Sequence, residues 1–279
     1  MLKKVLKYDL KFVFKFWWIG AVACLALSVL GGIGIYLQEM NTYVKELPFA
    51  VNLFSYIAII LAFIGFFAFS FLSEVLIIVR MYKNFFTDEG YLTFTLPVKK
   101  STLLNSKLLT SFIATVLTVI TALVNLFIML CVPYHKDIFS RDFTEALREF
   151  FTEIIDVIPV KYFVIYIIEV LAVLSLITLV SILVIYICMS IGSLIAKKGK
   201  VLVSFGIYYA FTNVLTTIVF IFMTVVAEPL INWTDKLDQE NGQFFLFLAL
   251  IFVICLLGFI GAILYTLQYR LLDKKLNLQ

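Results

Sequence analysis

Two glutamates stand inside long apolar stretches of this sequence and are the side chains best able to do chemistry there. Glu74 lies six residues before Arg80, near the end of one stretch, and Glu169 lies within another. If these stretches cross a membrane, a charged side chain in them is costly and tends to mark an ion or substrate site. We expect Glu74 to reach the inner interface and pair with a base. Glu169 is expected near the outer interface, where a wet vestibule, Lys161, or a substrate or proton site would satisfy it.

Amide and hydroxyl side chains in the same stretches form a second group. They are Asn125, Asn213, Thr216 and Thr217. Such groups typically join neighbouring helices through hydrogen bonds. Asn213 is kept, together with Glu169, as a candidate for a transport pathway or a gate.

The motifs of well-known enzyme classes are missing from the sequence. It has no GxxxxGKS/T phosphate-binding loop, no HExxH zinc motif and no GxSxG nucleophile motif. His135 is the only histidine, which excludes histidine-based metal clusters and most catalytic triads. The four cysteines lie in or at the ends of apolar runs without CxxC spacing, which favours small buried side chains: Cys24, Cys131, Cys188 and Cys255. We therefore expect no catalytic residue, no metal and no cofactor in this chain.

The composition itself indicates a membrane protein. Of the 279 residues, 63% are hydrophobic and 14% are charged, and the mean hydropathy is +1.08. A typical soluble protein has about 25% charged residues. A soluble core could not hide this much apolar surface, so we expect an all-α polytopic membrane protein that forms one transmembrane domain over 1–279.

Six apolar stretches are long enough to span a bilayer, which takes roughly 20 residues. They cover about 17–37, 50–79, 108–132, 160–196, 201–227 and 244–267. The first is too long for a cleaved signal peptide and is not followed by an A-x-A site. The sequence therefore predicts six transmembrane helices.

The distribution of basic residues predicts the orientation. With the N-terminus inside, 16 of the 22 Lys and Arg residues fall on the inner side of the membrane. Basic residues concentrate on the cytoplasmic side of membrane proteins. Both termini are therefore expected in the cytoplasm.

The segment before the first span, residues 1–16, is expected to form an amphipathic helix. Lys3, Lys7, Lys11 and Lys15 recur every four residues and make one basic stripe. Such a helix would lie on the inner leaflet, where each lysine gains on the order of 1 kcal/mol from anionic headgroups. An equally open interpretation is that the stripe only determines topology.

Segment 80–107 is the largest on the inner side. It contains the acidic turn Asp88-Glu89-Gly90 followed by apolar residues such as Tyr91 and Leu96. Exposed apolar side chains on an ordered loop need a partner or the membrane interface. A docking element for a cytoplasmic protein is therefore predicted, and the alternative is a connector that follows the membrane surface.

Segment 133–160 is the largest on the outer side. From Arg141 to Asp156 its apolar residues follow helical spacing opposite a charged face. This pattern predicts an amphipathic helix that rests on the membrane surface or caps the helix bundle. The outer segment 228–243 is expected to be a short acidic loop.

Two motifs resemble permease subunits of type-2 ABC transporters from Gram-positive bacteria. The inner segment carries Asp88-Glu89-Gly90-Tyr91-Leu92-Thr93-Phe94-Thr95-Leu96-Pro97-Val98, followed by Ser106-Lys107-Leu108-Leu109. The N-terminal run Leu6-Lys7-Tyr8-Asp9-Leu10-Lys11 looks like the start of those subunits. The six-span layout with both ends inside matches along the whole chain.

The resemblance implies a specific set of partners. Such permeases pair as two copies or two related subunits and bind two separate ATPase subunits, which hold the ATP and Mg²⁺. The N-terminal helix would be their elbow helix, and the loop between spans two and three would dock on the ATPase. The residues implied in this coupling are Arg80, Tyr82, Asp88, Glu89, Gly90, Tyr91, Leu96 and Pro97. In many type-2 members the outer loop between spans five and six holds short re-entrant helices, whereas here the larger outer segment lies between spans three and four.

The sequence thus predicts a non-enzymatic permease subunit of an ATP-driven exporter that works by alternating access. Its expected partners are the ATPase, a second permease and the lipid bilayer, but not nucleic acid. Its expected location is the plasma membrane of a Gram-positive bacterium. The alternatives are a stand-alone secondary transporter or channel, and a membrane anchor or sensor that transports nothing.

Overall fold

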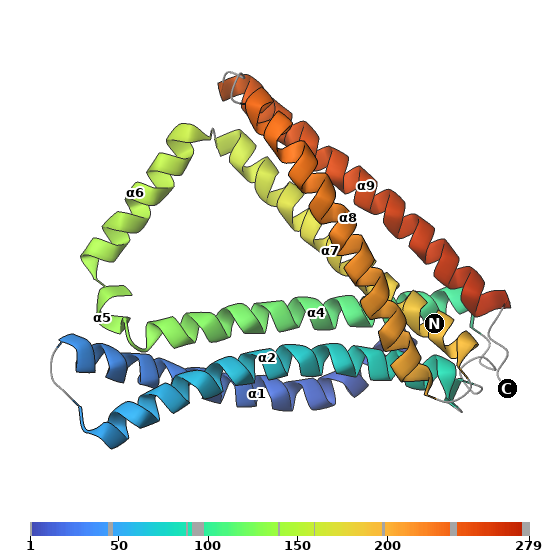
Figure 1. Ribbon diagram of the computed structural model, residues 1–279, viewed down its shortest axis with the longest axis horizontal. Helices are drawn as coiled ribbons and strands as arrows, with labels where there is room; N and C mark the ends of the chain where they lie inside the picture. Colours follow the sequence, from blue (N-terminus) through green and yellow to red (C-terminus); the bar gives the residue numbers. More distant parts are fainter. Residues whose placement is uncertain are drawn as a thin grey trace. The chain divides into compact units, whose positions relative to one another are not determined.

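A computed structural model describes residues 2–43, 47–87, 89–90, 98–138, 140–158, 160–196, 199–234 and 239–274. All regular secondary structure in these residues is helical. The helices, labelled as in Figure 1, are α1 (Leu2–Tyr43), α2 (Phe49–Phe86), α4 (Lys100–Cys131), α5 (His135–Ile138), α6 (Arg141–Val157), α7 (Val160–Ile195), α8 (Lys200–Thr234) and α9 (Gln239–Lys274).

Six helices of the described chain, α1, α2, α4, α7, α8 and α9, are each long and apolar enough to cross a membrane. They coincide with the six predicted spans and extend beyond several of them. The predicted all-α fold with six spans is therefore confirmed, and the chain is a multi-pass membrane protein. The side of the membrane on which each end lies stays a prediction.

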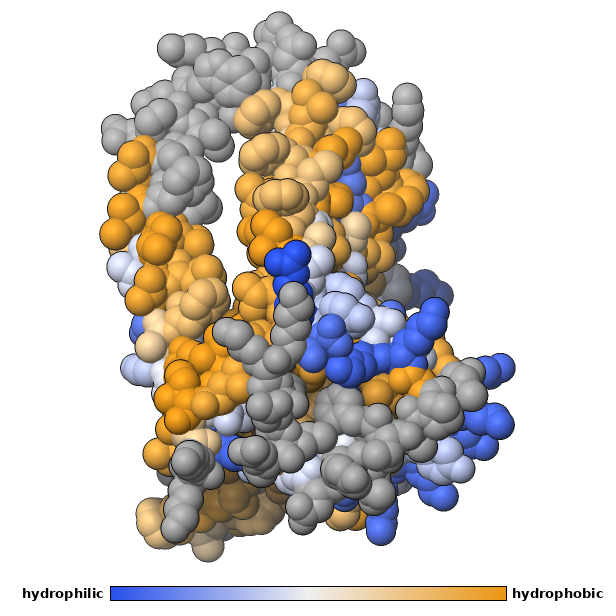
Figure 2. Space-filling model, turned by 90° about the vertical axis from the view of Figure 1, so that its right-hand side faces the viewer, coloured by the Kyte–Doolittle hydropathy of each residue, from blue (hydrophilic) through white to orange (hydrophobic). Residues whose placement is uncertain are grey.

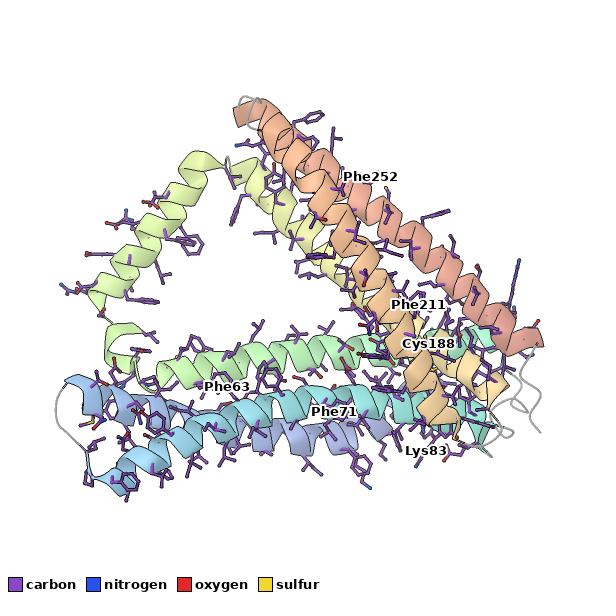
Figure 3. The ribbon with its side chains drawn as sticks, in the orientation of Figure 1. Phe63, Phe71, Lys83, Cys188, Phe211 and Phe252 are labelled. Carbon is purple, nitrogen blue, oxygen red and sulfur yellow. The ribbon has the colours of Figure 1, made fainter. Side chains whose placement is uncertain are left out.

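The surface of these helices is strongly apolar. Figure 2 shows long stretches of apolar residues, in orange, on the face of the molecule that is turned toward the viewer. Large side chains such as Phe71, Phe211 and Phe252 are exposed on three different helices (Figure 3). Exposure of such apolar side chains is unfavourable in water but is compatible with a surface surrounded by lipid.

Helix α1 is continuous from Leu2 to Tyr43, so residues 2–16 do not form a separate helix before the first span. Residues 2–16 contain neither proline nor glycine, and the first glycine of α1 is Gly20. The segment is also held by packing, because Asp9 and Val13 are fully buried. The expected amphipathic segment is therefore helical, but it is the first four turns of α1 itself.

The chain forms two compact units. One contains the chain up to Arg80 and Leu109–Ile154, and the other contains Met81–Leu108 and the chain from Ile155 onward. Helices α2 and α4 therefore each belong partly to one unit and partly to the other. We describe each unit by itself.

In the first unit, α1 approaches α2 closely along its glycines. A Cβ at Gly34 would lie 2.7 Å from the backbone oxygen of Ser55, and one at Gly31 would collide with Ala62. Small residues let transmembrane helices approach closely. These glycines therefore serve close packing in an unbroken helix.

Polar side chains also link the three long helices of this unit. The indole Nε1 of Trp17 donates to Thr118 Oγ1 at 2.9 Å, and Ser73 shares a 2.6 Å hydrogen bond with the same hydroxyl. Further along, Ser28 Oγ donates to Asn125 Oδ1 at 2.6 Å. Asn125 thus joins helices, as predicted.

In the second unit, α7 packs against both α8 and α9. Gly199, directly before α8, has a φ of 71°, which suits glycine better than other residues. Gln268 of α9 is fully buried and donates to Ser190 Oγ of α7 at 2.9 Å. This unit thus has a hydrogen-bonded core of its own.

Helix α6 confirms the amphipathic helix expected in the segment 133–160. Its first turn is capped by Ser140, whose Oγ accepts the N–H of Phe143 at 3.1 Å. The apolar side chains of Phe143, Leu147 and Phe150 are all exposed. An uncovered apolar face opposite a charged face favours contact with a membrane surface over a cap on the bundle.

The connections within the predicted segments 80–107 and 228–243 are shorter than expected, because the flanking helices continue into both segments. Helix α2 extends to Phe86 and α4 begins at Lys100, which leaves 87–99 between them. Helix α8 extends to Thr234, so Pro229 lies within it, and α9 begins at Gln239. The helix ends, rather than loops, therefore supply much of the structure outside the predicted spans.

Candidate functional site

The segment predicted to dock a cytoplasmic protein lies where α2 ends. Arg80 and Tyr82 are on α2, and Glu89 and Gly90 follow it. The N–H of Gly90 donates to the carbonyl oxygen of Thr87 at 2.7 Å. Gly90 is buried, whereas the Glu89 side chain is exposed. The remaining predicted docking residues lie outside the described residues: Asp88, Tyr91, Leu96 and Pro97.

Arg80 is placed differently from the other predicted docking residues. Its Nε and Nη2 donate to Oδ1 of Asp9 at 2.9 and 2.7 Å, and its guanidinium lies 4.8 Å from the centre of the Phe12 ring. The Asp9 side chain is 1% exposed and that of Arg80 is 17% exposed. Arg80 therefore fastens α1 to α2 within the first unit, and its geometry is that of a structural ion pair.

Glu74 does not make the ion pair that its spacing suggested. Its side chain is exposed, and no ion pair to it is found among the described residues. The nearby base, Arg80, is instead held by Asp9 from α1. Arg80 is therefore not the base that pairs with Glu74, and the expectation for Glu74 otherwise stays a prediction.

The helix ends on either side of the docking segment are tightly packed. Met81 and Phe85 of α2 and Leu103 and Leu104 of α4 are almost completely buried. These residues belong to the same unit as α7 and α9. These two helix ends cannot move far without moving the side chains packed against them.

Three polar contacts tie the start of α4 to α7 and α9. The hydroxyl of Tyr186 donates to the backbone oxygen of Lys107 at 3.2 Å. The hydroxyl of Tyr265 donates to Asn105 Oδ1 at 2.8 Å. Lys100 Nζ lies 2.8 Å from Oδ1 of Asp273 near the end of α9. No local pattern in the sequence predicts these contacts, because each joins residues at least 79 positions apart.

The basic stripe is present on α1 as predicted. Lys3, Lys7, Lys11 and Lys15 are all exposed along one helix. The opposite side of this part of α1 carries buried Asp9. Exposed lysines beside a span suit anionic lipid headgroups or an acidic protein surface.

Glu169 is the most unusual polar group in the second unit. It lies about 14 Å along the axis of α7 from Val160. The residue is only 6% exposed, and neither carboxylate oxygen has a hydrogen-bond partner among the described residues. The side chain of Lys161, one of its predicted partners, lies outside the described residues. A buried carboxylate without a partner is strongly unfavourable if ionised.

Asn213, the other predicted pathway residue, is not brought to Glu169. It lies on α8 with an exposed side chain, and its Nδ2 donates to the backbone oxygen of Tyr209 at 2.7 Å. Thr216 and Thr217 also bond to backbone oxygens of their own helix. These polar groups are satisfied within α8, and among the described residues none of them bonds to another helix. The expected role of Asn213 in a pathway stays untested.

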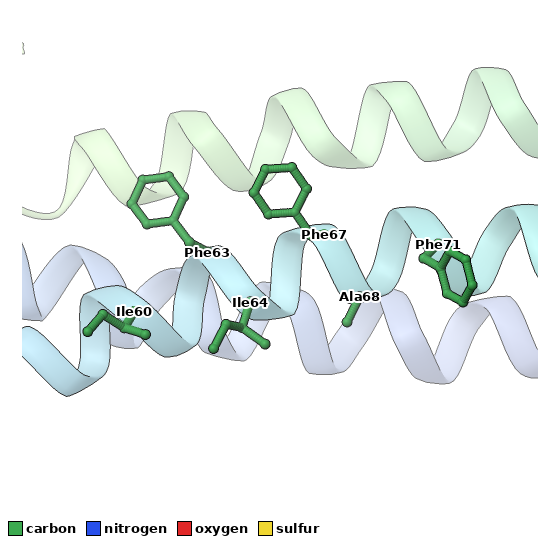
Figure 4. A pocket seen from close by; sticks show the side chains of 6 residues that line it. All are labelled: Ile60, Phe63, Ile64, Phe67, Ala68 and Phe71. Atoms are coloured by element: carbon green, nitrogen blue, oxygen red, sulfur yellow. The ribbon is translucent and has the colours of Figure 1, made fainter. Parts of the chain in front are cut away.

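A shallow groove on α2 has no chemistry of its own. Its lining is entirely apolar and follows one side of the helix (Figure 4): Ile60, Phe63, Ile64, Phe67, Ala68 and Phe71. Lipid tails fill such surfaces without specific recognition.

The described residues offer no group of three or more metal-ligating side chains. The cysteines Cys24, Cys131, Cys188 and Cys255 all have free thiols. Comparison of the chain with protein-family models, curated proteins and solved structures finds no match in any of the three. The site must therefore be interpreted from its own geometry.

Proposed function

We propose that this chain is the membrane-spanning permease subunit of an ATP-binding-cassette exporter. A separate ATPase would bind on the side predicted to be cytoplasmic and drive alternating access. The chain itself would bind no nucleotide, and a second permease copy or a related subunit would complete the pathway. The six apolar helices and the motif from Asp88 to Val98 support this proposal.

One observation carries the proposal furthest. The helix ends that flank the docking segment belong to the same compact unit as α7 and α9, not to the unit of α1. A displacement of the start of α4 would pass through Lys107 to Tyr186 and through Asn105 to Tyr265. Packed helices shift as units rather than deform continuously. This arrangement suits the transmission of force from an ATPase to the membrane helices.

Co-purification with an ATPase tests the proposal. We expect the full chain to co-purify with the ATP-binding-cassette ATPase encoded beside it and to stimulate ATP hydrolysis. Substitution Glu89→Lys should weaken this association and stimulation by about tenfold, since it reverses a charge on the predicted docking surface. The matched control is Glu145→Lys on α6, which should leave both unchanged. No association with the ATPase, or equal association of Glu89→Lys, would contradict the proposal.

Glu169 favours one second candidate, an ion-coupled secondary transporter. Buried carboxylates within membrane spans serve proton relays in several pumps and transporters. This candidate requires transport by the purified chain in liposomes when a proton gradient is the only energy source. Uptake under that condition would support the secondary transporter and exclude the need for an ATPase.

A further inference from the structure

The surroundings of Glu169 are rich in aromatic rings. Tyr162, Tyr166 and Glu169 follow each other at spacings of four and three residues, which places them on one face of α7. The two tyrosine rings stack with centroids 6.3 Å apart and an interplanar angle of 26°. Tyr166 is 9% exposed and lies one helical turn before Glu169. The three side chains thus share one face of α7, on which Tyr166 and Glu169 are buried and Tyr162 is half-buried.

Glu169 and Tyr166 present hydrogen-bond acceptors to a ligand. The Tyr166 hydroxyl donates its proton to the backbone oxygen of Gln243 at 2.7 Å, so that proton is not available to Glu169. The two carboxylate oxygens of Glu169 and the remaining lone pairs of the Tyr166 oxygen stay as acceptors. A ligand that completes the cluster must therefore bring donors, and a positive charge would match the carboxylate.

A metal ion does not suit this arrangement. Magnesium and calcium take at least six oxygen ligands, usually from several carboxylates or carbonyls. The described residues contain no group of three metal-ligating side chains. A single carboxylate beside stacked aromatic rings is instead the chemistry that recognises an organic ammonium ion, through an ion pair and cation–π contacts.

We propose that Glu169, Tyr166 and Tyr162 bind the ammonium group of a lipophilic amine, which is the substrate class of the transporter. The carboxylate of Glu169 would form an ion pair with the ammonium group. The tyrosine rings would contact the carbon atoms next to that group. Helix α9 adds Phe244 and Phe247, whose ring centroids are 6.4 Å apart. They follow closely after Gln243, whose backbone oxygen accepts the hydrogen bond from the Tyr166 hydroxyl. This inference rests on the proposed transport function, because it names what is transported.

Binding of a fluorescent amine to the full chain tests the inference. The chain is purified into phospholipid nanodiscs and titrated with dansylcadaverine, which carries one primary ammonium group. The N-acetyl derivative of the same probe has no charge and reports the purely apolar contribution. We expect the amine to bind the wild-type chain about tenfold or more tightly than its acetyl derivative.

Two variants locate the effect. Glu169→Gln should abolish the preference for the amine while it leaves binding of the acetyl derivative unchanged, which also shows that the variant is folded. Glu74→Gln is the matched control, because Glu74 is the other glutamate within a predicted span and its side chain is exposed. It should keep the full preference.

The wild-type chain gives a second measurement that needs no variant. A hydrophobic carbodiimide modifies buried carboxyl groups, and mass spectrometry locates the product. Labelling of Glu169 should slow in the presence of dansylcadaverine and not in the presence of its acetyl derivative.

Three outcomes would overturn the inference. They are equal binding of both probes to the wild type, an unchanged preference in Glu169→Gln, and labelling of Glu169 that the amine does not slow. None of these measurements involves an ATPase. Failure of ATPase co-purification would therefore count against the proposed function alone, and failure of amine binding would count against this inference alone.

Discussion

The ion pair between Asp9 and Arg80 shows how one residue can be assigned to the wrong surface when only its neighbours in sequence are known. Arg80 begins the basic segment after the second span, so it was expected on the docking surface. The structure turns it toward α1, where Asp9 accepts two hydrogen bonds from it and Phe12 lies beside it. The guanidinium is thereby removed from most of its contact with solvent.

Removal of Asp9 should leave the largely buried guanidinium of Arg80 without its carboxylate. We expect Asp9→Ala to destabilise the chain by about 3 kcal/mol, because the loss of one member of a buried pair costs far more than the pair contributes. Thermal unfolding of the purified chain in detergent measures the change.

The double variant Asp9→Leu with Arg80→Met is the control for this prediction. It removes both charges and should recover most of the lost stability, since apolar residues replace buried pairs at little cost. A single variant as stable as the wild type would show that Arg80 is solvated in the folded protein.

At the scale of helices, the close approach of α1 to α2 depends on the absence of side chains at the contact. Gly34 faces the backbone of Ser55, which cannot move aside as a flexible side chain could. Gly206 on α8, by contrast, has no atom within 4 Å of the position of a Cβ. The same substitution therefore has different consequences on the two helices.

We expect Gly34→Ala to lower the stability of the chain by about 1–3 kcal/mol, since the added methyl forces the helices apart. Gly206→Ala is the matched control and should leave stability unchanged or raise it slightly, because alanine favours helix. Both are measured by thermal unfolding in detergent. Equal effects of the two substitutions would refute close packing as the reason for Gly34.

For the whole molecule, the division into two units indicates which helices the predicted docking segment would move. Residues 81–108 are continuous with α2 and α4, yet they belong to the unit of α7 and α9. Lys100 and Asp273 join this segment to α9 near the surface, with side chains that are 40% and 45% exposed. An exposed ion pair contributes little stability, so its removal should leave the fold intact.

A charge swap tests this connection. Asp273→Lys should reduce stimulation of the proposed ATPase partner by about two- to fivefold, because an exposed pair contributes up to about 1 kcal/mol and is replaced by repulsion. Thermal stability should change little. The double variant Lys100→Asp with Asp273→Lys restores opposite charges and should restore stimulation. If the double variant were as impaired as the single one, the ion pair would not be the cause.

The sequence by itself determined the class of fold and the number of spans. Apolar stretches of sufficient length have no stable alternative to a helix in a bilayer, because every backbone polar group must be paired within its own segment. The amphipathic helix α6 was equally readable, since its spacing is local. These properties follow from neighbours along the chain.

Only the tertiary structure decided the partners of individual polar residues. Arg80 pairs with Asp9, 71 positions away, and Glu74 is left exposed, although it is far closer in sequence. Glu169 was visible in the sequence as a charge in an apolar run, but its burial and its lack of a partner among the described residues were not. Pairings between remote residues depend on which helix faces meet, and helices that are apolar on all sides carry little information about that in their sequence.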